Sequence, residues 1–170
     1  MIWPFYRFEC LIRQIPLNLY YPIFALTMLF LVALFIPKAQ FRHLFWISLF
    51  WGFFVCHFFI LIFGALLNLF QWVHAFPYVF LSAPIFIKIA WLFSIMLYFY
   101  FLPRRNEWYV LPMYILMFSF ISAALDQIFH QMGLLVYYHW NPWFRFLLAV
   151  VWFYLAQLHY RVLYPGNTRT

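Results

Sequence analysis

Residues 44–67 read LFWISLFWGFFVCHFFILIFGALL, an apolar stretch without a single Asp, Glu, Lys or Arg. A helix that crosses a membrane needs about 20 consecutive, mainly apolar residues. We therefore expect this stretch to cross a bilayer. Four more segments satisfy the same requirement, at about 17–36, 83–102, 108–125 and 143–163. The sequence predicts an all-α integral membrane bundle of about five transmembrane helices in a single domain, with four or six as alternatives.

Three further segments are rich in aromatic residues but are interrupted by polar residues or proline. They are residues 1–16, 68–82 and 126–142. Aromatic rings with a polar edge favour the boundary between lipid and water. We expect these segments to lie at the membrane interface. Residues 68–82 could instead form a re-entrant stretch or a sixth span. Short basic loops are expected at 37–42 and 103–107.

The composition excludes other protein classes. Charged residues make up 8% of the chain, against about 25% in an average soluble domain. A soluble fold with so few charges would expose large apolar patches. Disorder requires the opposite composition, and four glycines are too few for a collagen-like fibre. The chain is therefore expected to lie almost entirely in or on the bilayer, in a cell membrane.

The net charge of +7 is spread along the chain and does not form one basic face. Nucleic-acid binding is not expected, because it requires clustered basic residues that neutralise phosphates. Nearly all the basic residues, Arg145 among them, fall at the ends of predicted spans, where they set orientation and contact anionic lipid headgroups. Six Lys and Arg lie on the side of the C-terminus and three on the other. This bias predicts a cytoplasmic C-terminus.

Polar residues inside a bilayer are costly, so each one is a potential functional residue. Asp126 lies at the end of the fourth predicted span, four residues before His130, and the two would share one helix face. The carboxylate could orient the imidazole or help to bind a cation. The alternative is a carboxylate that anchors a helix at the interface. Lys88 would extend its amine to the headgroups or pair with Asp126.

A second set of polar and aromatic residues lies around the two ends of the fifth predicted span. It could form a small pocket with Asp126 and His130, or it could belong to the aromatic belts of the two interfaces. Its members are His139, Trp140, Asn141, Trp143 and His159.

Motifs for metal binding and for common enzyme chemistries are absent from the sequence. It contains no H-E-x-x-H, no His pair at i, i+4, no G-x-S-x-G and no phosphate-binding glycine loop. No metal, cofactor or catalytic residue is predicted. Cys10 and Cys56 form no spaced pair, and Cys56 is expected to be a buried thiol.

The C-terminal third follows a pattern that begins with Asp126-Gln-Ile-Phe and a glycine at 133. It continues through Tyr137 or Tyr138 and Trp140-Asn-Pro-Trp143 to Leu158-His-Tyr160. This pattern resembles an uncharacterised family of small multi-pass membrane proteins from spore-forming Gram-positive bacteria, in which the acid is often Glu. The resemblance covers about residues 122–163. It implies a helical integral membrane protein of a bacterial cell membrane and no particular reaction.

Three functions remain open from the sequence. The first is a non-enzymatic structural, sensory or interaction component whose polar residues bind a small ligand or organise the helices. The second is a transporter-like or substrate-binding subunit with a pocket between the fourth and fifth spans. The third is a lipid-modifying enzyme that uses Asp126 and His130 as an acid–base pair. The sequence does not name a protein partner.

Overall fold

The computed structural model describes residues 16–80, 83–103 and 107–164. Most of the predicted interfacial segment 1–16, the centre of the 103–107 loop and the C-terminal tail lie outside the described residues. The longer α-helices are α2 (Tyr20–Phe35), α3 (Lys38–Ser48), α5 (Ile85–Tyr100), α6 (Val110–Gln131) and α7 (Pro142–Leu163). Helix α3 continues into further helical segments, which are described below. A 3-10 turn, η1 (Leu17–Leu19), precedes α2.

The prediction of an all-α helical membrane bundle is confirmed. Within the described residues, four helical stretches are long and apolar enough to cross a membrane, namely Leu17–Phe35, Lys38–Leu66, Val110–Gln131 and Pro142–Leu163. The third predicted span contains the shorter helix α5, whose 16 residues would extend about 24 Å. Half of its side chains are buried, because it packs against α2, α3 and the segment that follows α3. It is the central helix of the bundle.

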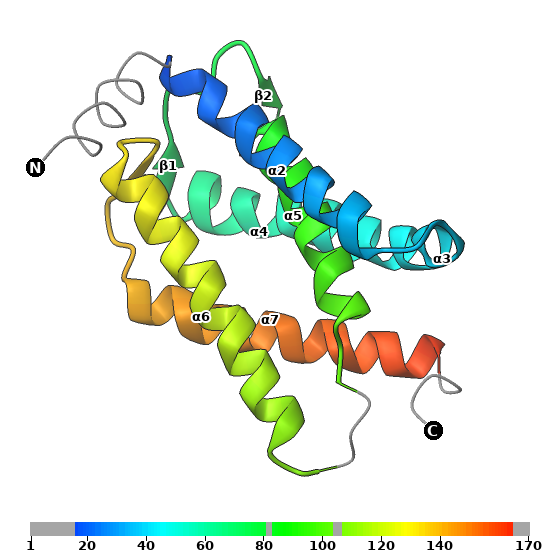
Figure 1. The fold of residues 1–170 in the computed structure, drawn as a ribbon. Helices are drawn as coiled ribbons and strands as arrows, with labels where there is room; N and C mark the ends of the chain where they lie inside the picture. Colours follow the sequence, from blue (N-terminus) through cyan, green and yellow to red (C-terminus); the bar gives the residue numbers. More distant parts are fainter. Residues whose placement is uncertain (1–15, 81–82, 104–106, 165–170) are drawn as a thin grey trace, which may run out of the picture.

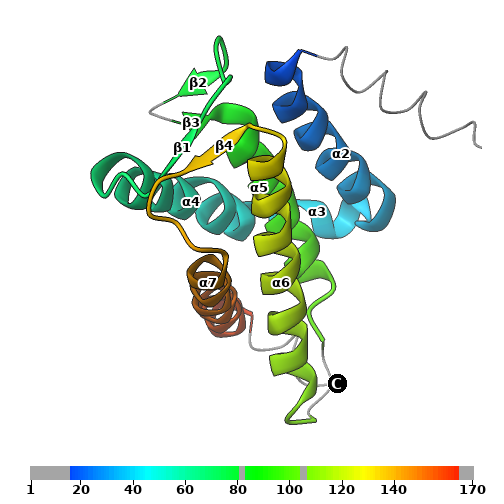
Figure 2. The same cartoon turned by 90° about the vertical axis from the view of Figure 1, so that its left-hand side faces the viewer.

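We call α2, the continuous helix Lys38–Leu66, α5, α6 and α7 the five passes. The start of α2, the short strands and the start of α7 lie toward the top and the left in Figure 1. The α2–α3 turn, the end of α5, the start of α6 and the end of α7 lie toward the right and the bottom. The passes cross one another steeply, since α7 is seen almost end-on where α6 stands upright (Figure 2).

The second pass is one continuous helix that starts before the predicted span. It begins at Lys38 and changes from α to π geometry in two segments, η2 (Leu49–Val55) and η3 (Ile60–Leu66), on either side of α4 (Cys56–Phe59). Pro37 is its N-cap, and the Pro37 carbonyl accepts from the amide of Gln40 at 2.9 Å. The predicted loop 37–42 is therefore mostly the first turn of a helix, because proline presets the backbone for a helix start.

Helix α6 continues to Gln131, beyond the predicted end at 125, so Asp126 and His130 are helical. Residues 126–132 contain neither glycine nor proline, and the next residue, Gly133, has φ 73°. The amide of Gly133 donates to the His130 carbonyl, and the amide of Leu134 donates to the Phe129 carbonyl at 2.9 Å. These two bonds form a Schellman motif, which favours glycine at this position.

The predicted interfacial segments contain short strands. β1 (Phe70–Trp72) pairs antiparallel with β4 (Leu135–Tyr137), and β2 (Val79–Phe80) pairs with β3 (Ala83–Pro84). Residues 68–80 contain no helix, so this part of the chain does not form a sixth helical span. The pairing of β1 with β4 connects the end of the second pass to the α6–α7 link.

Candidate functional site

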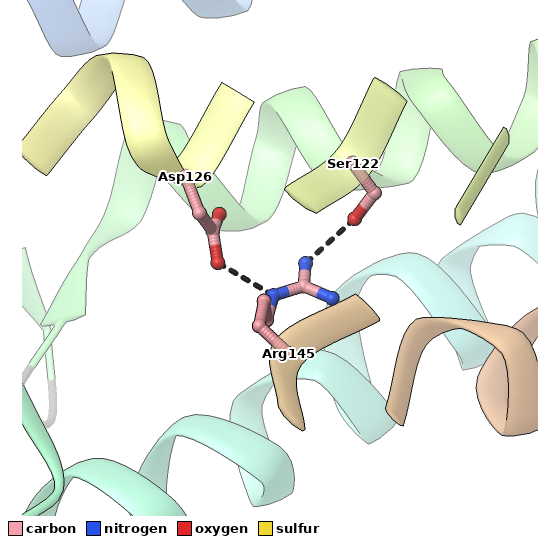
Figure 3. A network of polar contacts seen from close by, with 3 residues as sticks. All are labelled: Ser122, Asp126 and Arg145. Atoms are coloured by element: carbon pink, nitrogen blue, oxygen red, sulfur yellow. Dashed lines mark hydrogen bonds and ion pairs between the residues drawn. The ribbon is translucent and has the colours of Figure 1, made fainter. Parts of the chain in front are cut away.

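Asp126, Arg145 and Ser122 form a polar cluster inside the bundle (Figure 3). The Arg145 Nε atom donates to Asp126 Oδ2 at 2.5 Å, and an Arg145 Nη atom donates to Ser122 Oγ at 2.6 Å. Asp126 is 8% exposed and Arg145 is 9% exposed. This is an ion pair largely removed from solvent, within a fold that has few charges.

The fold brings the three residues together by crossing α6 with α7. Ser122 and Asp126 are four residues apart on α6 and therefore lie on one helix face. Arg145 lies in the first turn of α7, which the Asn141 side chain caps by accepting from the Trp143 amide at 2.8 Å. Asn141 therefore acts as an N-cap, which fixes where α7 begins and where Arg145 points.

The Arg145 guanidinium retains hydrogen-bonding capacity. A guanidinium carries five N–H donors, and the two bonds to Asp126 and Ser122 use two of them. One Nη atom points away from both partners (Figure 3). No side chain of the described residues accepts from that atom. The guanidinium carbon also lies 5.7 Å from the centre of the Trp91 ring, a cation–π distance.

The polar cluster borders a cavity of about 50 Å³, here called the inner cavity. Its walls are mainly apolar, with aromatic side chains such as Phe59, Trp91 and Trp152. Cys56, a buried free cysteine, also lies in them. A space of about 10–15 Å³, measured in this way, holds one water molecule. The inner cavity therefore has room for a few water-sized groups beside the ion pair.

Lys88 is fully buried and does not reach the headgroups as expected for a snorkelling lysine. Its Nζ atom donates to the Phe80 carbonyl at 2.7 Å and lies 4.8 Å from the centre of the Phe80 ring. The alternative partner, Asp126, is paired with Arg145 instead. The β2–β3 hairpin therefore supplies the acceptor that allows this lysine to be buried.

His130 lies on the strand side of α6. Its Nδ1 atom is 2.8 Å from the Leu135 carbonyl oxygen, and its ring stacks on Tyr137 at a centroid distance of 4.1 Å. The structure shows no bond between His130 and Asp126. A carbonyl oxygen can only accept, so Nδ1 carries a proton and donates it to Leu135. His130 therefore holds β4 against the end of α6.

The remaining residues of the predicted pocket lie in different surroundings. Trp140 is buried among Phe59, Phe63 and Phe70, whereas His139 and Trp143 are exposed. His159 lies near the other end of α7, where its Nδ1 atom accepts from Trp51 Nε1 at 3.0 Å. These residues do not line the inner cavity.

The sequence does not predict two members of the polar cluster. Arg145 resembles the other basic residues at span ends, and nothing in the sequence distinguishes Ser122. One signal was present, since a lone acid within an apolar span requires a positive partner. Among the described residues, no group of three His, Cys, Asp or Glu is arranged to hold a metal ion. Comparisons of the chain with protein-family models, with curated proteins and with solved structures found no match.

Proposed function

We propose that this membrane protein is a non-enzymatic ligand-binding component, sensory or transporter-like, whose site is the inner cavity with Asp126, Arg145 and Ser122. The observation that carries the proposal is a buried ion pair that borders a mainly apolar cavity and retains unused N–H donors. Binding sites are typically apolar and concave, with a few polar groups that fix the orientation of the ligand.

A purely structural role is the second possibility, and one observation favours it. Arg145 joins α6 to α7 by two bonds, which would also serve a protein that only organises helices. The cavity beside the pair distinguishes the two functions, because helix packing alone favours a filled space.

We also propose the membrane in which the protein lies and the orientation of its C-terminus. The resemblance of residues 122–163 to a family from spore-forming bacteria supports a bacterial cell membrane. The bias of basic residues supports a cytoplasmic C-terminus and contacts with anionic headgroups.

A thermal-shift experiment on purified protein in neutral detergent tests the binding function. The probes are decanoate, decylamine, phenylalanine and benzyl alcohol, which represent an anion, a cation, a zwitterion and a neutral molecule. Ser122→Ala removes an acceptor of Arg145. Ser119→Ala is the matched control, because Ser119 Oγ donates to its own helix at the Ile115 carbonyl and lies outside the cavity.

We expect at least one probe to raise the melting temperature of the wild type and of Ser119→Ala. Its apparent affinity should be about tenfold lower in Ser122→Ala, as for one lost hydrogen bond in a buried site. If no probe stabilises the wild type, or if both variants respond alike, the binding function is wrong and the structural role is favoured.

A further inference from the structure

We propose that the ligand is a single-chain amphiphile with an acidic end group, a fatty-acid-like monocarboxylate. Its carboxylate would bind the free end of the Arg145 guanidinium, and its apolar chain would extend into a second, wider cavity. This inference rests on the proposed function and specifies its ligand.

The hydrogen-bonding groups at the inner cavity favour a ligand that accepts. Arg145 lines the cavity, and no side chain of the described residues accepts from one of its Nη atoms. A guanidinium makes its strongest hydrogen bonds to carboxylates and other anionic acceptors, because these bonds are assisted by charge. An anionic acceptor therefore suits this donor better than a neutral one.

The shape of the donor group favours a planar acid. The Nε atom faces Asp126 and one Nη atom faces Ser122, which leaves the other Nη atom free (Figure 3). A carboxylate fits the two-pronged end of a guanidinium. The inner cavity, of about 50 Å³, has room for such a small group but not for the headgroup of a phospholipid with its glycerol.

A wider space adjoins the inner cavity. This outer cavity, of about 400 Å³, lies between the end of the second pass and the short strands, and it is lined mainly by apolar residues with Asn68 and Gln71. Ile60, Phe70 and Trp72 line both cavities. The two spaces are therefore neighbours, separated by these three side chains, and together they match a ligand with a small head and a longer body.

Trp72 provides an independent sign of a polar group at this boundary. Its Nε1 atom is buried and has no hydrogen-bond partner among the described residues. A buried N–H without a partner costs free energy, so such atoms are nearly always paired. A carboxylate that passes or rests at the boundary would accept from it.

Protection of Cys56 from alkylation tests the ligand class. The full chain with Cys10→Ser is placed in phosphatidylcholine nanodiscs, so that Cys56 is its one thiol, and its rate of reaction with N-ethylmaleimide is measured. The probes are decanoate, decan-1-ol, decylamine and acetate. A second set of nanodiscs contains phosphatidylglycerol and no probe, to test a lipid headgroup as the source of the anion.

We expect decanoate to slow the alkylation at least fivefold, with little effect from decan-1-ol or decylamine. Acetate should require at least a tenfold higher concentration, because it lacks the chain. Trp72→Phe should raise the half-saturating concentration of decanoate about tenfold, whereas the exposed control Trp143→Phe should leave it unchanged.

The other outcomes are distinguishable. Protection by decylamine or decan-1-ol that equals or exceeds that by decanoate overturns the acidic ligand but leaves the binding function standing. Protection by phosphatidylglycerol alone assigns the anion to a lipid and overturns the monocarboxylate. Protection by none of the probes overturns the ligand class and, with a negative thermal-shift experiment, the binding function as well.

Discussion

Arg145 supplies the positive charge that the buried Asp126 carboxylate requires. Its bond to Asp126 at 2.5 Å neutralises a carboxylate that is 8% exposed, in a fold whose helices are otherwise nearly uncharged. A buried ion pair adds little net stability compared with a well-packed apolar pair, but the loss of one partner leaves an uncompensated charge. The cost of a substitution should therefore depend on whether one partner or both are replaced.

A double-mutant cycle tests this coupling. Arg145→Met and Asp126→Leu should each lower the free energy of unfolding by about 3–5 kcal/mol, because each leaves a buried charge. The double variant should lose much less than the sum. The measurement is unfolding in mixed micelles, followed by circular dichroism.

A second cycle serves as the control. Lys88→Met combined with Asp126→Leu should give additive losses, since the Lys88 amine donates to the Phe80 carbonyl and not to Asp126. Additive losses for Arg145 and Asp126 would show that the pair is not coupled.

At the scale of the elements, the close approach of α5 to the second pass builds the cavity wall. Gly52, in η2, lies against the backbone of α5, and a Cβ atom added there would lie 2.5 Å from Leu92 Cα. Glycine therefore allows two backbones to approach in a way that any side chain would prevent. π-Helical segments such as η2 and η3 frequently occur at functional sites, and Gly52 and Gly64 each border one of the two cavities.

Gly52→Ala should lower stability by about 1–3 kcal/mol, as overpacking of a core does. Gly64→Ala is the matched control, because a Cβ atom at that position would lie 3.4 Å from Phe70, an ordinary contact. Thermal melting of the two variants in the same detergent gives the comparison. Equal melting temperatures would show that the α5 backbone moves aside at little cost.

At the scale of the whole molecule, the start of α2 and the end of α7 lie on opposite sides of the bundle (Figure 1). The structure also bears on the count of Lys and Arg on the two sides of the predicted spans. Arg145 belongs in that count to the side opposite the C-terminus, yet it is buried beside Asp126. Without it the count is six basic residues to two, so the predicted orientation stays the same.

A reporter fused after Thr170 tests this orientation. A green fluorescent protein fusion should fluoresce, and an alkaline phosphatase fusion should be inactive, because the C-terminus is expected in the cytoplasm. An active phosphatase with a dark fluorescent fusion would reverse the topology. A fusion at the N-terminus should give the opposite pair of results if the five passes all cross.

The sequence by itself determined the fold class and the existence of the passes, because these depend on local composition. An uninterrupted apolar stretch such as 44–67 must satisfy its backbone groups internally in lipid, and a helix does this. Helix ends were less predictable, since Pro37 and Gly133 set them through backbone geometry that composition does not record. The strands of 68–84 were not predicted, because β1 pairs with β4 from a distant part of the chain.

Only the tertiary structure decided which polar groups meet. Asp126 could be singled out because a carboxylate in an apolar span is costly wherever it lies. Its partner depended on how α6 crosses α7, and that crossing brings Arg145, not His130 or Lys88, to the carboxylate. The cavity beside the pair is likewise a product of packing between four passes and a strand, which no local pattern specifies.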